Sequence, residues 1–179
     1  MPTAQQLTDI KRQLRQLEPT GVLATEYIDN LVTILTAGAE ETVARITADK
    51  VFNNDGTLAD LTGLVTGTLS INSTYDVELV LRIESASATP GADIKFVIPA
   101  GATLKWALGS PADVAGAELT EATTQGVATI AGTGLVTAKG ILKIGATAGT
   151  IKVQGAQSTP TVEDTKYKVD SNLTVTKIA

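Results

Sequence analysis

The chain has 179 residues, the length of one domain or of one domain with an appendage. It contains no histidine and no cysteine, so the commonest general base, metal ligand and soft nucleophile are missing, and we expect no enzyme and no metal or cofactor site. Its net charge of -5 argues against nonspecific nucleic-acid binding and against an anionic membrane surface as a partner.

Residues 1–39 have the periodicity of helices. A first helix is predicted before Pro19, because the residue before a proline avoids the helical conformation, and a second is predicted over residues 25–35. The apolar residues on one face of the first helix are Leu7, Ile10, Leu14 and Leu17. The basic residues on its opposite face are Lys11, Arg12 and Arg15.

Two roles are open for each face of this first helix. The apolar face either docks onto a partner or a symmetry-related copy, or packs on the protein's own sheets, since so short a helix cannot hold a coiled coil alone. The basic face either meets an acidic partner surface or is solvated. We expect residues 1–39 to form an attachment and oligomerisation segment, and residues 40–179 to form a β-sandwich domain.

From residue 43 onward the sequence has the pattern of β-strands separated by turns. The clearest strand is Tyr75–Glu84, in which apolar residues occupy the odd positions and mostly charged residues the even ones. Further strands are predicted at residues 43–51, 94–98, 103–108, 127–131, 135–144, 150–154, 166–169 and 173–178. About eight or nine strands with no helix between them favour an antiparallel, jelly-roll-like β-sandwich, with residues 110–125 as a long loop.

Several residues that could carry chemistry have simpler interpretations. Trp106 is predicted to be a core residue, because it shares one side of a strand with Leu104 and Leu108. Glu78 and Glu84 occupy even positions of one strand, so we expect a solvated sheet face rather than a catalytic acid/base pair. Residues 53–56 are predicted to be a turn, because they lack the ligand pattern of a calcium loop.

The order of motifs after residue 45 resembles a domain of tailed-bacteriophage virion structural proteins, found in head-decoration, fibre and tail-associated proteins. The motifs are TLADLTGL ending at Leu64, NSTYDVELVL from Asn72, DIKFVIPAGAT from Asp93, KGILKIGATAGTIKV from Lys139 and YKVDSNLTVTKI from Tyr167. Each motif alone consists of turn signals, and the resemblance lies in their order and spacing. The helical residues 1–39 are not covered by it.

The resemblance implies a structural protein of the virion, assembled in the cytoplasm of the bacterial host. We expect a capsid decoration, or cement, protein that binds the lattice of the major capsid protein as a homo-oligomer, namely a trimer. Only 18% of the residues are charged, below the roughly 25% of soluble domains, which favours a packed oligomer surface. A tail-associated fibre or adaptor protein is the alternative within this class.

A carbohydrate-binding module is the alternative from another class. Its site would lie in the loops at residues 85–92 and 110–125. Sugar sites stack rings on several aromatic side chains, and only 3% of this chain is aromatic, which argues against this alternative.

Overall fold

The computed structural model describes residues 41–109, 118–127 and 131–179, and this part of the chain forms twelve strands and no helix. The predicted helices lie outside the described residues. So do the proposed interface positions Leu7, Ile10, Lys11, Arg12, Leu14, Arg15 and Leu17. Their roles and the boundary at residue 39 therefore stay predictions.

The larger of two sheets, called sheet A here, has the central strand order β1-β12-β4-β9-β6-β7. These strands are β1 (Glu41–Arg45), β12 (Asn172–Lys177), β4 (Thr74–Ser85), β9 (Gly132–Lys143), β6 (Thr103–Gly109) and β7 (Leu119–Thr120). The sheet continues beside β12 and β1 through β11 (Thr165–Tyr167), which pairs with the end of β4, and β2 (Lys50–Phe52), which pairs with β11.

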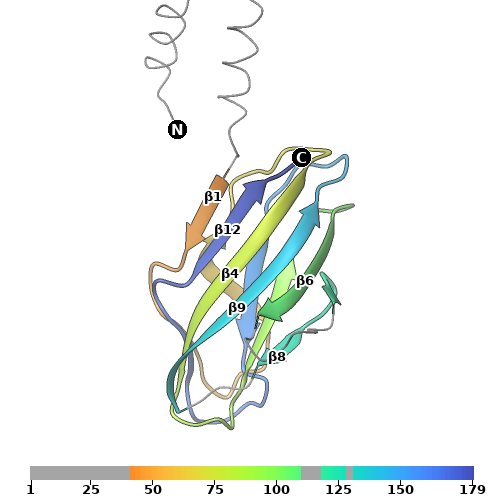
Figure 1. Ribbon diagram of the computed structural model, residues 1–179. Helices are drawn as coiled ribbons and strands as arrows, with labels where there is room; N and C mark the ends of the chain where they lie inside the picture. Colours follow the sequence, from red (N-terminus) through yellow and green to blue (C-terminus); the bar gives the residue numbers. More distant parts are fainter. Residues whose placement is uncertain (1–40, 110–117, 128–130) are drawn as a thin grey trace, which may run out of the picture. The chain divides into compact units, whose positions relative to one another are not determined.

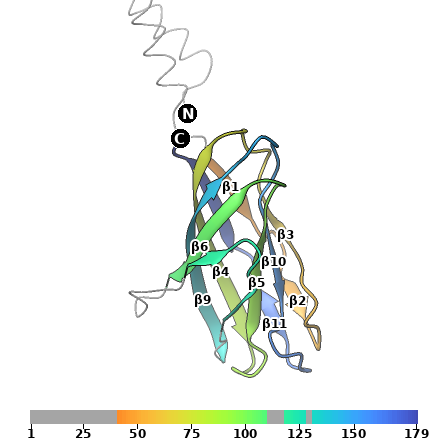
Figure 2. The ribbon, with the colours of Figure 1, turned by 90° about the vertical axis from the view of Figure 1, so that its right-hand side faces the viewer.

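The smaller sheet, called sheet B, has the order β3-β10-β5-β8. Its strands are β3 (Ala59–Val65), β10 (Lys152–Ala156), β5 (Ala92–Val97) and β8 (Gln125–Val127). Every strand pair in both sheets is antiparallel. Seen edge-on, the two sheets form separate layers, with β4, β9 and β6 in one and β3, β10 and β5 in the other (Figure 2). The predicted mainly β, antiparallel class is confirmed.

The core lies between the two layers and is built by strand alternation. In β4 the odd-numbered residues from Tyr75 to Ile83 are buried, as the sequence pattern predicts, while the even-numbered ones face outward. Trp106 of sheet A meets Phe96 of sheet B edge-to-face, with ring centroids 4.9 Å apart. Trp106 is 2% exposed, so its predicted core role is confirmed.

The strand predicted over residues 43–51 is wrong as a single element, because it is divided into β1 and β2. Between them Asp49 accepts hydrogen bonds from the Val169 N–H at 2.8 Å and from Lys168 Nζ at 2.5 Å. The segment that pairs with these residues is divided at the same position, so that β1 pairs with β12 and β2 pairs with β11. The contacts of Asp49 join positions 119 and 120 residues apart, so no local pattern indicates the break.

The sequence pattern does not predict strand β3. Its buried residues Leu61 and Leu64 are three positions apart, which conceals the period of two. The spacing is explained by an irregular register against β10, together with the positive φ of Gly63, 98°. Strand β7 likewise lies inside the segment predicted as a long loop, and β8 begins two residues before the strand predicted at 127–131.

Candidate interaction surface

The outer face of sheet A is the broadest surface of the described chain that carries ordered rows of side chains, and Figure 1 looks onto it. The strand registers place alternate residues side by side across β1, β12, β4, β9 and β6. One row consists of Glu41, Thr176, Asp76, Ile141 and Lys105. The next row consists of Val43, Thr174, Glu78, Lys139 and Ala107.

Charged side chains of both signs lie on this face. The side formed by β1, β12 and β4 carries the carboxylates Glu41, Asp76 and Glu78, and the guanidinium groups of Arg45 and Arg82 lie on the same side. The side formed by β9 and β6, which we call the basic half, carries Lys105, Lys139 and Lys143, and Glu118 pairs with Lys105 there. The two sides meet at one ion pair, in which Lys139 Nζ lies 3.3 Å from a Glu78 carboxylate oxygen.

Large apolar side chains are exposed on the same face. Val43 is 44% exposed on β1, Ile141 is 39% exposed on β9, and Leu135 of β9 is 69% exposed. Both threonines and charged residues are their neighbours, since Ile141 lies between Asp76 and Lys105, and Leu135 lies beside Arg82.

A hollow of about 280 Å³ lies in the basic half. Its lining residues are Lys105, Trp106, Ala107, Glu118, Lys139, Gly140 and Ile141. Gly140 makes this geometry possible, since a Cβ at that position would lie 2.6 Å from the Lys105 carbonyl oxygen and 2.8 Å from Trp106 Cβ. The hollow therefore combines apolar residues with Lys139 and with a lysine, Lys105, that pairs with Glu118.

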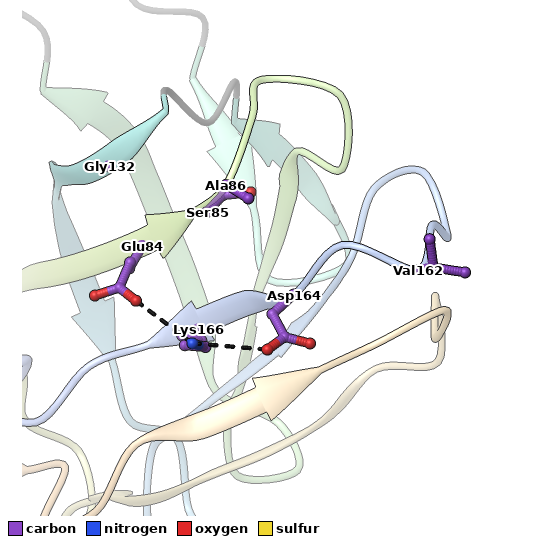
Figure 3. Close-up of a pocket in the computed structure, with 7 residues that line it drawn as sticks. All are labelled: Glu84, Ser85, Ala86, Gly132, Val162, Asp164 and Lys166. Atoms are coloured by element: carbon purple, nitrogen blue, oxygen red, sulfur yellow. Dashed lines mark hydrogen bonds and ion pairs between the residues drawn. The ribbon is translucent and has the colours of Figure 1, made fainter.

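A second hollow, of about 490 Å³, lies where β4 meets β11 (Figure 3). Lys166 lies between two carboxylates there, with its Nζ 3.5 Å from Glu84 and 3.6 Å from Asp164. Lys168 extends the network, because its Nζ also lies 3.4 Å from Glu84. The carboxylates are neutralised by lysines, so the site has the character of an ion-pair network rather than of an acid/base pair.

The two glutamates at even-numbered positions of β4, Glu78 and Glu84, form ion pairs with different lysines. Glu78 faces Lys139, whereas Glu84 faces Lys166 and Lys168. Both side chains are part-exposed on the outer side of the strand, as the alternation predicts. Each is held by a cross-strand lysine, a role that could not be seen without the strand register.

The ion pair between Asp49 and Lys168 makes the free energy of unfolding depend on pH. The hydrogen bond from Lys168 lowers the pKa of Asp49 from its ordinary 3.8 and raises the pKa of Lys168 from its ordinary 10.5. The contribution of Asp49 to the free energy of unfolding is present above pH 3.8 and is lost as the pH falls through the lowered pKa of Asp49. The contribution of Lys168 to the free energy of unfolding is present below pH 10.5 and is lost as the pH rises through the raised pKa of Lys168.

We therefore expect Asp49→Asn to lower the urea midpoint of unfolding at neutral pH. The gap, which is the difference in urea midpoint between variant and wild type, should narrow in acid because Asp49 of the wild type becomes protonated. Urea unfolding at a series of pH values measures this gap. Asp76→Asn is the control, because Asp76 makes no ion pair among the described residues, and it should leave the midpoint nearly unchanged. A gap for Asp49→Asn that stays constant down to strong acid would contradict the assignment.

Tyr167 joins the two sheets through a buried hydroxyl that the sequence did not single out. The hydroxyl donates to the Asp93 carbonyl at 2.6 Å and accepts from the Ala156 N–H at 3.3 Å, both in sheet B. Burial raises the pKa of Tyr167, so the hydroxyl keeps its proton. Gly155 leaves space for the ring, because a Cβ there would lie 2.6 Å from Tyr167 Cζ. The role of this tyrosine is structural.

The described residues contain no group of three or more Asp and Glu side chains placed to hold a metal ion. No helix in this part of the chain is long and apolar enough to cross a membrane. No family model matches the chain, and a search of curated proteins finds no match.

Proposed function

We propose that this chain is a structural protein of a tailed-bacteriophage virion, and that it decorates the capsid by binding the lattice of the major capsid protein. It acts by forming contacts and not by catalysis, without a cofactor, as a homotrimer located in the virion. The observation that carries this proposal is the strand order of the two sheets, taken together with the motif order in the sequence.

The strand order supports a jelly roll, a fold used by viral capsid proteins among others. A jelly roll of eight strands places strands one, eight, three and six in one sheet and strands two, seven, four and five in the other. The order β1-β12-β4-β9 fits the first sheet when β1 with β2 and β11 with β12 each count as one strand. The order β3-β10-β5-β8 fits the second. Strands β6 and β7 are then an addition at the edge.

The positions of the motifs agree with this interpretation. The segment Pro99–Gly101 forms the turn between β5 and β6, with Gly101 at a positive φ of 76°. The segment Gly145–Gly149 lies between β9 and β10. These two segments of the motifs thus lie at the connections between successive strands, where turn residues are required by the backbone and not by a ligand.

The outer face of sheet A supports a role in assembly. Its exposed apolar residues can be buried against a partner, and weak contacts of this kind add up when symmetry repeats them on a particle. Attachment to the capsid is assigned to residues 1–39, whose predicted first helix has an apolar face and a basic face. The acidic remainder of the chain leaves this basic face as the part suited to an acidic capsid surface.

The test is co-sedimentation of the full-length protein with capsids of the phage that encodes it. We expect the protein to pellet with capsids, and a chain lacking residues 1–39 to stay in the supernatant while remaining folded by circular dichroism. Reversing Lys11, Arg12 and Arg15 to glutamate should weaken binding, whereas the control substitution Lys95→Glu on sheet B should not.

Other results would replace the proposal. Binding to tails but not to capsids would identify the fibre or adaptor alternative. Retention on a glycan array without binding to either would favour the carbohydrate-binding module. A truncated chain that unfolds would show that residues 1–39 belong to the core of the domain.

A further inference from the structure

We propose that residues 47–57, which we call the strap, separate from β11 in acid while the two sheets stay folded. The strap contains β2 and connects β1 of sheet A to β3 of sheet B. Its separation uncovers the aromatic ring of Tyr167, which Phe52 of β2 covers at neutral pH. The inference concerns the described β-sandwich alone and does not depend on the proposed function.

The strap has little apolar contact with the rest of the protein. Between Ile46 and Leu61, a stretch that the structure describes without a gap, Phe52 is the only buried residue. Its ring meets that of Tyr167 edge-to-face, with centroids 5.6 Å apart. Among the described strands, β2 pairs with β11 alone, and over three residues only. A segment with so few buried side chains and one-sided backbone pairing has a low local stability.

Polar contacts with carboxylates therefore contribute much of what holds the strap. Asp49 accepts hydrogen bonds from Lys168 and from the Val169 N–H. Farther along the strap, the Asn53 side-chain amide donates to the Asp164 carboxylate at 2.9 Å. Hydrogen bonds to an ionised group are stronger than those to a neutral one, so both contacts weaken when the carboxylate takes up a proton.

The same carboxylates separate three ammonium groups at the junction of β2 and β11. Glu84 lies 3.5 Å from Lys166 and 3.4 Å from Lys168, and Asp164 lies 3.6 Å from Lys166 (Figure 3). Lys50 of β2 pairs in register with Tyr167, between these two lysines. With Asp49, three carboxylates balance three lysines at neutral pH. Once the carboxylates are neutral, the lysines of the strap and of β11 repel each other.

The surroundings of this network supply few other charges. Arg82 of β4 pairs with Asp170, Glu163 accepts a hydrogen bond from Ser87, Asp55 accepts one from the Thr57 N–H, and β9 places the uncharged Gly132 and Thr133 beside the end of β4.

The remaining ion pairs of the described residues explain why the sheets stay folded. Each joins one lysine or arginine to one carboxylate: Arg82 with Asp170, Lys105 with Glu118, Lys139 with Glu78, and Lys152 with Asp60. Single pairs at an exposed surface contribute little to stability, so their loss in acid leaves the core between the sheets intact. In the network, by contrast, the Lys168 side chain is only 20% exposed.

Hydrogen exchange of the full-length protein, measured residue by residue at neutral pH and at about pH 2.5, below the ordinary pKa of carboxylates, tests the proposal. Protection factors are compared, so that the intrinsic pH dependence of exchange cancels. We expect the amides of Lys50–Phe52 to lose at least roughly tenfold more protection in acid than those of residues 79–81 in β4. Fluorescence of Trp106, in the core, should stay native.

Replacing two lysines distinguishes repulsion from simple loss of a contact. Lys166→Met with Lys168→Met should lower the protection of the strap at neutral pH, because ion pairs are lost. In acid it should raise that protection above the wild-type value, because the repelling charges are gone. Lys152→Met, which removes the ion pair with Asp60 on sheet B, is the matched control and should leave the strap unchanged at both pH values.

Three results would overturn the proposal. One is a wild-type strap that keeps its protection in acid, and another is a strap that loses protection together with β4 as the whole domain unfolds. The third is a lysine variant that lowers the protection of the strap equally at both pH values. If that variant does not fold, the comparison of the strap with β4 in the wild type still decides.

Discussion

Leu81→Ala is expected to lower the free energy of unfolding by about 2–5 kcal/mol, because it removes a side chain from a packed core and leaves a cavity. Leu81 is 0% exposed at the middle of β4, the central strand of sheet A. Its strand is paired on both sides, so the backbone around it cannot collapse into the space. Urea unfolding monitored by circular dichroism measures the change.

The matched control lies on the other side of the same strand. Glu78→Ala removes a part-exposed side chain with one exposed ion pair, to Lys139, and should change stability by less than about 1 kcal/mol. Equal effects of the two substitutions would show that both faces of β4 are buried, and that the outer face is already covered in the protein as it exists in solution.

Gly63→Ala is expected to cost at least about 3 kcal/mol, since two effects add. Gly63 has a φ of 98°, which side chains rarely adopt, and a Cβ there would lie 2.2 Å from the Arg45 carbonyl oxygen. That contact joins β3 of sheet B to β1 of sheet A at the edge of the two layers. The alanine must therefore push these edges apart.

Gly101→Ala separates the two effects. Gly101 also has a positive φ, 76°, but a Cβ at this position would meet no atom within 4 Å, so only backbone strain of about 1–2 kcal/mol is expected. Thermal and urea unfolding of both variants measure the difference. Similar losses for the two would mean that the close approach of Gly63 to Arg45 contributes nothing.

The clearest elements could be predicted because their residues repeat with the strand period. Val77, Leu79 and Ile83 alternate with polar residues, and a shift by one position would bury charges and expose the apolar set. Trp106 could be placed in the core for the same reason. Strand β3 could not be found in this way, because its bulge at Gly63 changes the spacing of Leu61 and Leu64.

The candidate surface could be predicted only in part. The alternation in β4 indicates that Glu78 points outward, but not that Lys139 lies beside it or that Glu41 lies two strands away. These neighbours come from strands far apart in the sequence. The residues that the sequence did propose as an interface, from Leu7 to Leu17, lie outside the described part of the chain and remain a prediction.

The sequence by itself determined the mainly β class, the inward side of the long strands and the turns between them, because these depend on local periodicity and on residues suited to turns. Only the tertiary structure decided the strand order, the division of 43–51 into two strands, the hollow above Gly140 and which charged side chains become neighbours on sheet A. Each of these depends on which distant strands become neighbours and in which register. The local conformational preferences of the residues do not specify that pairing.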